Sequence, residues 1–128
     1  MAIYLLDTSV IIDVLNQKRG RWQLLGSLVE AGDTLACSVV TLTEIYAGVR
    51  PKEVVFTERF LEGLEHYDLD SHLARLAGLL KNEWSKKGRT LGVVDLIIAA
   101  TALAHNLVLM TDNRKDFPMR KLSFYPLP

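Results

Sequence analysis

A single cysteine, Cys37, is present among the 128 residues of the chain. One thiol excludes an internal disulfide bond and a zinc site built from several thiolates. The apolar neighbours of Cys37 predict a position in the core, and a free buried thiol suits the reducing cytoplasm.

Long apolar runs are also missing. The longest, residues 96–104, has about half the length that a membrane-spanning helix needs. No basic segment precedes the N-terminal apolar run, and Asp7 interrupts it, which does not fit a signal peptide. We therefore expect a soluble cytoplasmic protein with no membrane partner.

Excess charge of either sign is absent, because fifteen basic side chains balance fifteen acidic ones. No overall field attracts nucleic acid, so a polyanionic partner must be held locally.

Repeats and Pro- or Ser-rich linkers are absent too, and the length predicts a single domain over residues 1–128. Hydrophobic residues make up 49%, which is high for a small domain and predicts that some surface is buried against another chain.

Apolar runs alternate along the chain with segments of helical periodicity. Short buried runs predict strands, and apolar residues three or four apart predict helices. This alternation favours a mostly parallel sheet with helices on both faces, in which ligands bind beyond the carboxyl ends of the strands. The expected strands are residues 3–6, 34–38, 107–110 and 122–125 with a brief extended piece at 67–69, and the expected helices begin at Thr8 or Ser9, Trp22, Thr41, Pro51, Asp70 or Ser71, and Asp95.

Five acids stand where an apolar run ends or a helix begins. Asp7 directly follows the first predicted strand, and Asp112 follows the strand 107–110 with one residue between, so both should lie at one edge of the sheet. Glu44 and Asp95 lie in the predicted first turns of helices, where a carboxylate is favoured, and Asp116 is close to Asp112. Carboxylates that meet would take up protons unless a cation lies among them, and Mg²⁺ or Mn²⁺ fits best.

Each acid also has a purely structural explanation. Asp7 and Asp95 can act as helix caps, Thr41 and Glu44 form a correct capping box, and turn chemistry favours acids in residues 112–116. Asp95, however, leads into a helix that has no polar face, so a merely structural acid there is awkward. Neither a Ser–His–Asp nucleophile motif nor a Gly-rich phosphate loop offers another site.

Four ordered segments carry a resemblance to a known family. They resemble the motifs of PIN-domain ribonucleases, and most closely those of VapC toxins from bacterial and archaeal toxin–antitoxin pairs. The likeness extends from Ile3 to about Phe117, although residues 52–92 match only as a helical region of suitable length. The four segments are residues 5–13 (LLDTSVIID), 38–49 (SVVTLTEIYAGV), 95–102 (DLIIAATA) and 109–117 (LMTDNRKDF).

The resemblance implies a three-layer α/β/α PIN-like fold and a Mg²⁺- or Mn²⁺-dependent endoribonuclease, the toxin of a type II, VapBC-like pair. In the family, an acidic cluster cleaves RNA. Asp7, Glu44 and Asp95 take the places of the first three family acids. Both Asp112 and Asp116 match the last motif, so either is a candidate for the fourth acid.

Roles at the metal are implied in the same way. Asp7 and Asp95 are expected to bind Mg²⁺ directly, since this ion keeps several waters, while Glu44 and the fourth acid, Asp112 or Asp116, hold waters or a second ion. The ion would activate a water molecule, so no protein nucleophile is needed. The residues expected to support the acids by hydrogen bonding are Thr8, Thr111 and Asn113.

The expected partners are an RNA substrate, a second copy of the chain in a homodimer, and a cognate antitoxin. The antitoxin would place an apolar segment, and an arginine, in the groove of the acids. Arg114, Lys115, Arg120 and Lys121 either hold flanking phosphates or form an ordinary solvated loop.

Two alternative functions remain open. A receiver-like phosphoacceptor domain also places acids around Mg²⁺ on a parallel sheet, but it requires adjacent acids after the first strand, where only Asp7 stands. A non-catalytic PIN-fold module would bind proteins through its apolar face, although acids at all four family places argue against it.

Overall fold

One parallel sheet forms the centre of the computed structural model, which describes residues 1–128. Its five strands lie in the order β3-β2-β1-β4-β5, and every neighbouring pair is parallel. In the middle, Leu5 pairs with Ala36 on one side and with Leu109 on the other. The strands are β1 (Ile3–Leu6), β2 (Thr34–Ser38), β3 (Glu65–Tyr67), β4 (Val108–Met110) and β5 (Ser123–Phe124).

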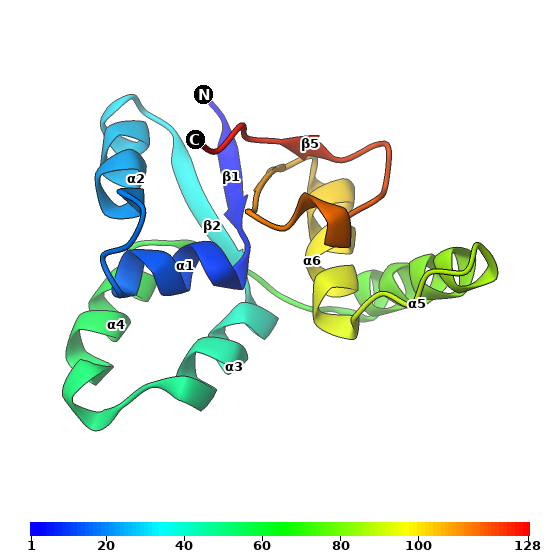
Figure 1. Ribbon diagram of the computed structural model, residues 1–128, viewed down its shortest axis with the longest axis horizontal. Helices are drawn as coiled ribbons and strands as arrows, with labels where there is room; N and C mark the ends of the chain where they lie inside the picture. Colours follow the sequence, from blue (N-terminus) through cyan, green and yellow to red (C-terminus); the bar gives the residue numbers. More distant parts are fainter.

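Six helices connect and cover the strands (Figure 1). Two 3₁₀ turns, Pro51–Glu53 and Arg114–Asp116, complete the regular structure. None of the helices is both long enough and apolar enough to cross a membrane. The helices are α1 (Thr8–Leu15), α2 (Arg21–Glu30), α3 (Val39–Gly48), α4 (Val54–Glu62), α5 (Ser71–Lys86) and α6 (Val93–His105).

Two apolar cores lie on opposite faces of the sheet. Successive strand residues point to opposite faces, so Leu5 belongs to one core and Leu6 to the other. Helices α5 and α6 cover the face of Leu5, and α1, α2 and α4 cover the face of Leu6 (Figure 1). The fold is therefore the predicted three-layer α/β/α arrangement with a parallel central sheet.

The middle of helix α6 has the burial that its composition predicts, whereas Val93 and Ala104 are exposed. Every side chain from Leu96 to Ala102 is buried. The one polar group among them, the hydroxyl of Thr101, donates to the carbonyl of Ile97 at 2.7 Å. This helix runs along the sheet and brings its N-terminal turn, with Asp95, to the edge where β1 and β4 end.

Several predicted boundaries are wrong, including the start of α6, which lies at Val93 and not at Asp95. The third helix does not begin at Thr41, because β2 runs directly into α3 and Ser38 caps it by accepting from the amide of Val40 at 3.2 Å. Glu44 therefore lies in the second turn of α3 and forms no capping box with Thr41. The extended piece predicted at 67–69 lies at Glu65–Tyr67, because pairing with β2 fixes its register.

Cys37 lies on β2, in the core beneath α1, α2 and α4, and is fully buried as predicted. Burial raises the pKa of its thiol to about 11. The thiol is therefore protonated at any physiological pH.

Candidate active site

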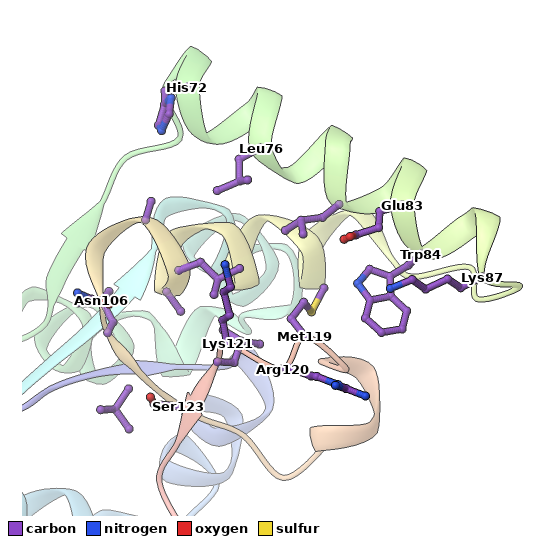
Figure 2. A pocket seen from close by; sticks show the side chains of 17 residues that line it. His72, Leu76, Glu83, Trp84, Lys87, Asn106, Met119, Arg120, Lys121 and Ser123 are labelled. Atoms are coloured by element: carbon purple, nitrogen blue, oxygen red, sulfur yellow. The ribbon is translucent and has the colours of Figure 1, made fainter.

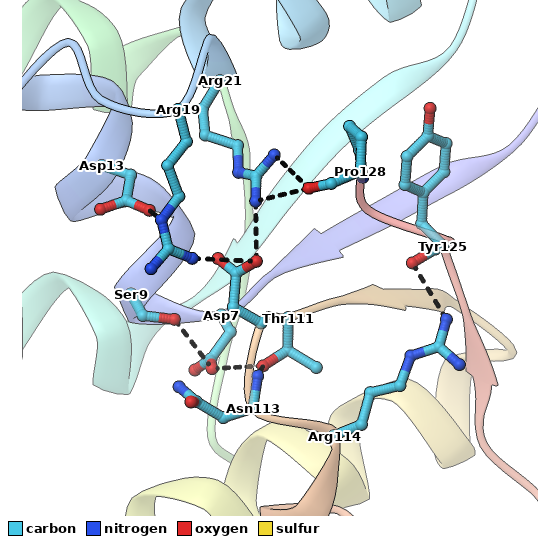
Figure 3. A network of polar contacts seen from close by, with 11 residues as sticks. Asp7, Ser9, Asp13, Arg19, Arg21, Thr111, Asn113, Arg114, Tyr125 and Pro128 are labelled. Carbon is cyan, nitrogen blue, oxygen red and sulfur yellow. Dashed lines mark hydrogen bonds and ion pairs between the residues drawn. The ribbon is translucent and has the colours of Figure 1, made fainter.

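Asp7 joins the ends of the two central strands. Its amide donates to the carbonyl of Met110 at 2.9 Å, which fixes the end of β1 against the end of β4. Its Oδ1 accepts from the amide of Thr8 at 2.8 Å, so Asp7 caps α1. Its Oδ2 accepts from the hydroxyls of Thr111 at 2.8 Å and Ser9 at 3.3 Å (Figure 3). The side chain is thus held in one orientation while the residue is only 5% exposed.

Glu44 reaches the same edge from α3. Its Oε1 lies 2.6 Å from the hydroxyl oxygen of Thr8, which in turn lies 3.1 Å from that of Thr41. Because a carboxylate only accepts, Thr8 donates to Glu44 and Thr41 donates to Thr8. The chain of hydroxyls ties the first turn of α1 to α3.

Asp95 lies in the first turn of α6, and Gly92, not Asp95, is the cap residue. The pKa of Asp95 is raised to about 6, first by burial and then by the negative charges of Asp7, Asp116 and Glu44. Burial also raises the pKa of Asp7, against the hydrogen bonds from Thr111, Thr8 and Ser9. Carboxylates from three other segments are therefore close enough to act on the charge of Asp95.

The two candidates for the fourth acid lie in different surroundings. Asp116 ends the 3₁₀ turn Arg114–Asp116, and its charge acts on Asp95. Asp112 is engaged in ion pairs, because its Oδ1 lies 2.7 Å from Nη2 of Arg21 and 3.5 Å from Nη1 of Arg19. The charges of Asp7, Glu44 and Asp116 thus all act on Asp95, whereas Asp112 is paired with two arginines. We call Asp7, Glu44, Asp95 and Asp116 the acidic cluster.

The acidic cluster fits a hard divalent cation with a large share of water ligands. No three Asp, Glu, His or Cys side chains are arranged to ligate one ion jointly. Mg²⁺ ordinarily retains several waters and takes one or two carboxylates from the protein, so a triad of direct ligands is not required. The donors are all oxygens, and burial, which raises the pKa of Asp7 and of Asp95, disfavours the negative charges that a bound cation would offset.

Two of the three residues expected to support the acids contact them through their side chains, and the third, Asn113, contacts Thr111 instead. Thr8 contacts Glu44 and Thr111 contacts Asp7, as described above. Asn113 acts through its backbone, because its amide donates to the hydroxyl of Thr111 at 2.9 Å.

Sequence reasoning missed four residues of the surrounding network: Ser9, Thr41, Arg19 and Arg21. Ser9 follows Asp7 by two positions, a spacing at which hydroxyls and caps interact, so its contact was open to prediction. Arg21 gives no such signal, because an arginine at the start of an amphipathic helix is ordinarily exposed.

The basic residues near the last motif are divided between separate places. The guanidinium of Arg114 lies over the ring of Phe124 at 4.8 Å and donates to the carbonyl of Tyr125 at 3.3 Å. Arg120 and Lys121 line a groove of about 680 Å³ between α5, α6 and residues 119–123 (Figure 2). None of the five acids lines this groove, which borders the beginning of β4 and not its end.

An apolar surface lies next to the acidic cluster. Its members are exposed and come from α1, α2, α3 and α4. The rings of Trp22 and Phe56 lie 5.8 Å apart, and a hollow of about 190 Å³ joins Ile12 to Glu44. We call it the α1–α4 patch, and it consists of Ile12, Trp22, Tyr46, Val55 and Phe56.

Known proteins resemble this chain in sequence and in fold. The family model for the PIN domain matches residues 4–123. Ribonuclease VapC19 of Mycobacterium tuberculosis is 32% identical over 115 residues, which cover 90% of this chain and 92% of that protein. Ribonuclease VapC2 of Haemophilus influenzae is 31% identical over 122 residues, covering 91% of each chain.

A solved structure extends the likeness to three dimensions. The crystal structure of VapBC2 from Rickettsia felis, bound to a DNA fragment from their promoter, contains a chain that superimposes with a TM-score of 0.84 at 28% identity. The superposition covers 96% of this chain and 97% of that chain.

Proposed function

Since this chain belongs to the PIN-domain family, and within it to the VapC-type ribonucleases, we propose that it is a divalent-metal-dependent endoribonuclease. In this proposal the whole chain, residues 1–128, is a single nuclease domain that acts on RNA in the cytoplasm. The observation that carries the proposal is the acidic cluster, in which burial and then the charges of three neighbouring carboxylates raise the pKa of Asp95.

The residues of the acidic cluster have different roles at the metal in this proposal. Asp7 and Asp95 hold Mg²⁺, or Mn²⁺ in its place, and Glu44 and Asp116 hold water ligands or a second ion. A bound ion supplies neutralisation of charge and a water of lowered pKa for attack on a backbone phosphorus. Thr111 and Ser9 keep Oδ2 of Asp7 in place, and Thr8 does the same for Glu44. No side chain is required as a nucleophile.

Purified protein and RNA test the nuclease proposal. We expect cleavage with Mg²⁺ or Mn²⁺ and none with chelator, and a loss of about 100-fold or more in Asp7→Asn or Asp95→Asn, because metal catalysis is worth several kcal/mol. The matched control is Asp68→Asn, an exposed acid outside the cluster, which should cleave normally. RNA that stays intact with both metals, or an Asp7→Asn variant as active as the native chain, would contradict the proposal.

The same variants separate the nuclease from the alternatives. A non-catalytic binding module predicts that Asp7→Asn and Asp95→Asn leave function unchanged. A receiver-like domain has the strand order 2-1-3-4-5, whereas β1 lies between β2 and β4 here. The fold and the family therefore both exclude the receiver-like alternative.

We further propose that the protein is the toxin of a VapBC-like pair and that its antitoxin covers the α1–α4 patch. The similar chain from Rickettsia felis was crystallised in a VapBC2 complex. Large exposed apolar groups such as Trp22 and Phe56 are typical of an interface, and the neighbouring carboxylates suit an arginine of the partner.

Titration of a co-expressed antitoxin into the RNA assay tests this partner. Cleavage should fall as the complex forms, and Trp22→Ala with Phe56→Ala should weaken inhibition, while Leu79→Ala, an exposed leucine on α5, should not. Undiminished cleavage at saturating antitoxin would count against the proposal. The homodimer stays a prediction, which light scattering of the purified chain tests.

A further inference from the structure

Arg21 is the most buried charged side chain outside the acidic cluster. It is the first residue of α2, and it is 1% exposed. Its Nη2 lies 2.7 Å from Oδ1 of Asp112, and Nη1 and Nη2 each lie 3.5 Å from the carbonyl oxygen of Pro128 (Figure 3). The buried Nε has no hydrogen-bond partner.

Three features make this arginine a poor means of stabilising the fold. Its guanidinium has lost its water, its Nε is left unsatisfied, and it stands at the helix end where the backbone dipole disfavours a cation. The preceding loop adds backbone strain, because Gln17 and Arg19 have left-handed φ angles of 53° and 56°. Because a buried ion pair is weak evidence for stability, the contribution of Arg21 is sought in what it holds.

Arg21 holds the segment that follows β4. Asp112 is its partner, and the adjacent Thr111 donates to Oδ2 of Asp7 while accepting from the amide of Asn113. The amide of Asp116 then donates to the carbonyl of Asn113 at 2.9 Å, which continues the segment into the acidic cluster. The ion pair of Arg21 with Asp112, shorter and more buried than that of Arg19 with Asp112, thus helps to fix a hydrogen-bond donor to Asp7 and the backbone that carries Asp116.

We propose that Arg21 is a positioning residue for RNA cleavage. Its pairing with Asp112 holds residues 111–116 so that Thr111 orients Asp7 and Asp116 stays beside Asp95. In this role Asp112 serves as an anchor of the site and not as a fourth acid. The inference rests on the proposed nuclease function, but its effect on residues 111–116 is independent of cleavage.

The central test compares Arg21→Met with the native chain. We expect kcat to fall about 10-fold and KM for RNA to change less than about twofold, because the loss of an orienting contact costs this much while RNA still binds. Mn²⁺ affinity, measured by calorimetry, should fall several-fold. Amide hydrogen exchange should speed up in residues 111–117 and stay unchanged in α5. Arg75→Met, on the exposed surface of α5, is the matched control and should behave as the native chain.

Additional variants separate positioning from general loss of stability. Arg21→Lys keeps the charge and should recover part of the lost kcat. Thr111→Val removes the donor to Asp7. The double variant Thr111→Val with Arg21→Met should lose a smaller factor in kcat than the product of the two single losses, because both residues act on Asp7. If Arg21→Met does not fold, Asp112→Asn is used instead, because it keeps the shape of the side chain and weakens the ion pair with Arg21. It should change kcat, Mn²⁺ affinity and amide exchange in the same directions, at about a third of the size.

Results that contradict the positioning role of Arg21 differ from results that contradict the nuclease function. Unchanged exchange in residues 111–117, or strictly multiplicative losses in the double variant, would overturn the positioning role. Faster exchange over the whole chain in proportion to lost activity would also overturn it. A native chain that cleaves no RNA would instead refute the nuclease function, and the exchange and Mn²⁺ measurements would still decide the role of Arg21.

Discussion

Asp95 shows two opposing electrostatic effects on one carboxylate. The N-terminal turn of α6 favours negative charge, with an effect of about 0.3–1 kcal/mol. Burial and three neighbouring carboxylates disfavour that charge, and they are the stronger influence, since the pKa of Asp95 is raised to about 6. Without a cation, the side chain is half protonated near this pH.

The raised pKa predicts how the stability of the metal-free protein depends on pH. Between the ordinary value of 3.8 and about 6, folded Asp95 binds more protons than unfolded Asp95, so the free energy of unfolding decreases as pH rises through this window. We expect a decrease of about 1–2 kcal/mol, less than 1.4 kcal/mol per pKa unit because Asp95 is only partly buried. Denaturant unfolding in chelator at pH 4 to 7.5 measures it.

Asp95→Asn is the matched variant for this measurement. It should show a flatter profile and a higher stability at pH 7.5 than the native chain, together with lost cleavage. The pKa of Asp7 is raised in the same direction, so a smaller slope should remain. A native stability that increases from pH 4 to 7.5 would contradict the assignment.

Asp116 and Asp112 should respond differently to the same substitution. Asp116→Asn removes a charge from the acidic cluster, so we expect a loss of about 100-fold in kcat and weaker Mn²⁺ binding. Asp112→Asn leaves the cluster intact and should lose less than about 10-fold. Steady-state cleavage with calorimetry of Mn²⁺ measures both, and equal losses would contradict the separate roles.

Sequence alone identified the positions of the acids but not this difference. Asp7 and Asp112 were expected at one edge because the carboxyl ends of parallel strands meet there, and Glu44 and Asp95 were expected in the first turns of helices. Asp112 and Asp116 were equivalent, since both stand in one polar segment. What separates them is an arginine 91 positions away in the chain, a contact that no local pattern contains.

At the scale of the elements, single capping residues link strands to helices at the active edge. Asp7 alone separates β1 from α1, and α3 begins directly after Ser38, the last residue of β2. The predicted start of α3 at Thr41 was wrong because the capping-box pattern of Thr41 and Glu44 is valid locally. Tertiary contacts override this local capping pattern, since Thr41 is fully buried and its hydroxyl bonds to Thr8.

Helix α5 offers a cap whose loss should affect stability without affecting cleavage. Asp70, one of the two cap residues that the sequence offered beside Ser71, caps it by accepting from the amide of Leu73 at 2.8 Å. Asp70→Ala should cost about 1 kcal/mol and lower Tm by about 3–5 °C, with kcat unchanged, because α5 carries none of the acids. Thermal unfolding and RNA cleavage measure the two effects, and a large loss of kcat would show that α5 participates in catalysis.

For the whole molecule, the order of the strands determines which loops meet. With β1 between β2 and β4, the segments that follow these three strands gather at one edge, and they bring Asp7, Glu44 and Asp116 together. The alternation of strands and helices predicted a parallel sheet but not its order, because several orders satisfy the same pattern. The complete fold was expected only through the resemblance to PIN domains.

Binding of a divalent ion should stabilise the whole molecule by mass action. At a concentration of about 100 times Kd, Mn²⁺ should add about 2.7 kcal/mol to the free energy of unfolding. The increase in Tm should disappear with chelator and in Asp7→Asn and Asp95→Asn, while Asp68→Asn should retain it. An equal increase in the variants would place the ion elsewhere.

The burial of Cys37 has a practical consequence for experiments on this protein. A thiol that is inaccessible and has a pKa of about 11 reacts little with maleimides or oxidants. Since it is the only cysteine of the chain, one introduced on the surface can carry a fluorophore or spin label at a single known position. Distances between such probes can then report how residues 111–116 respond to a metal, an RNA or a partner chain.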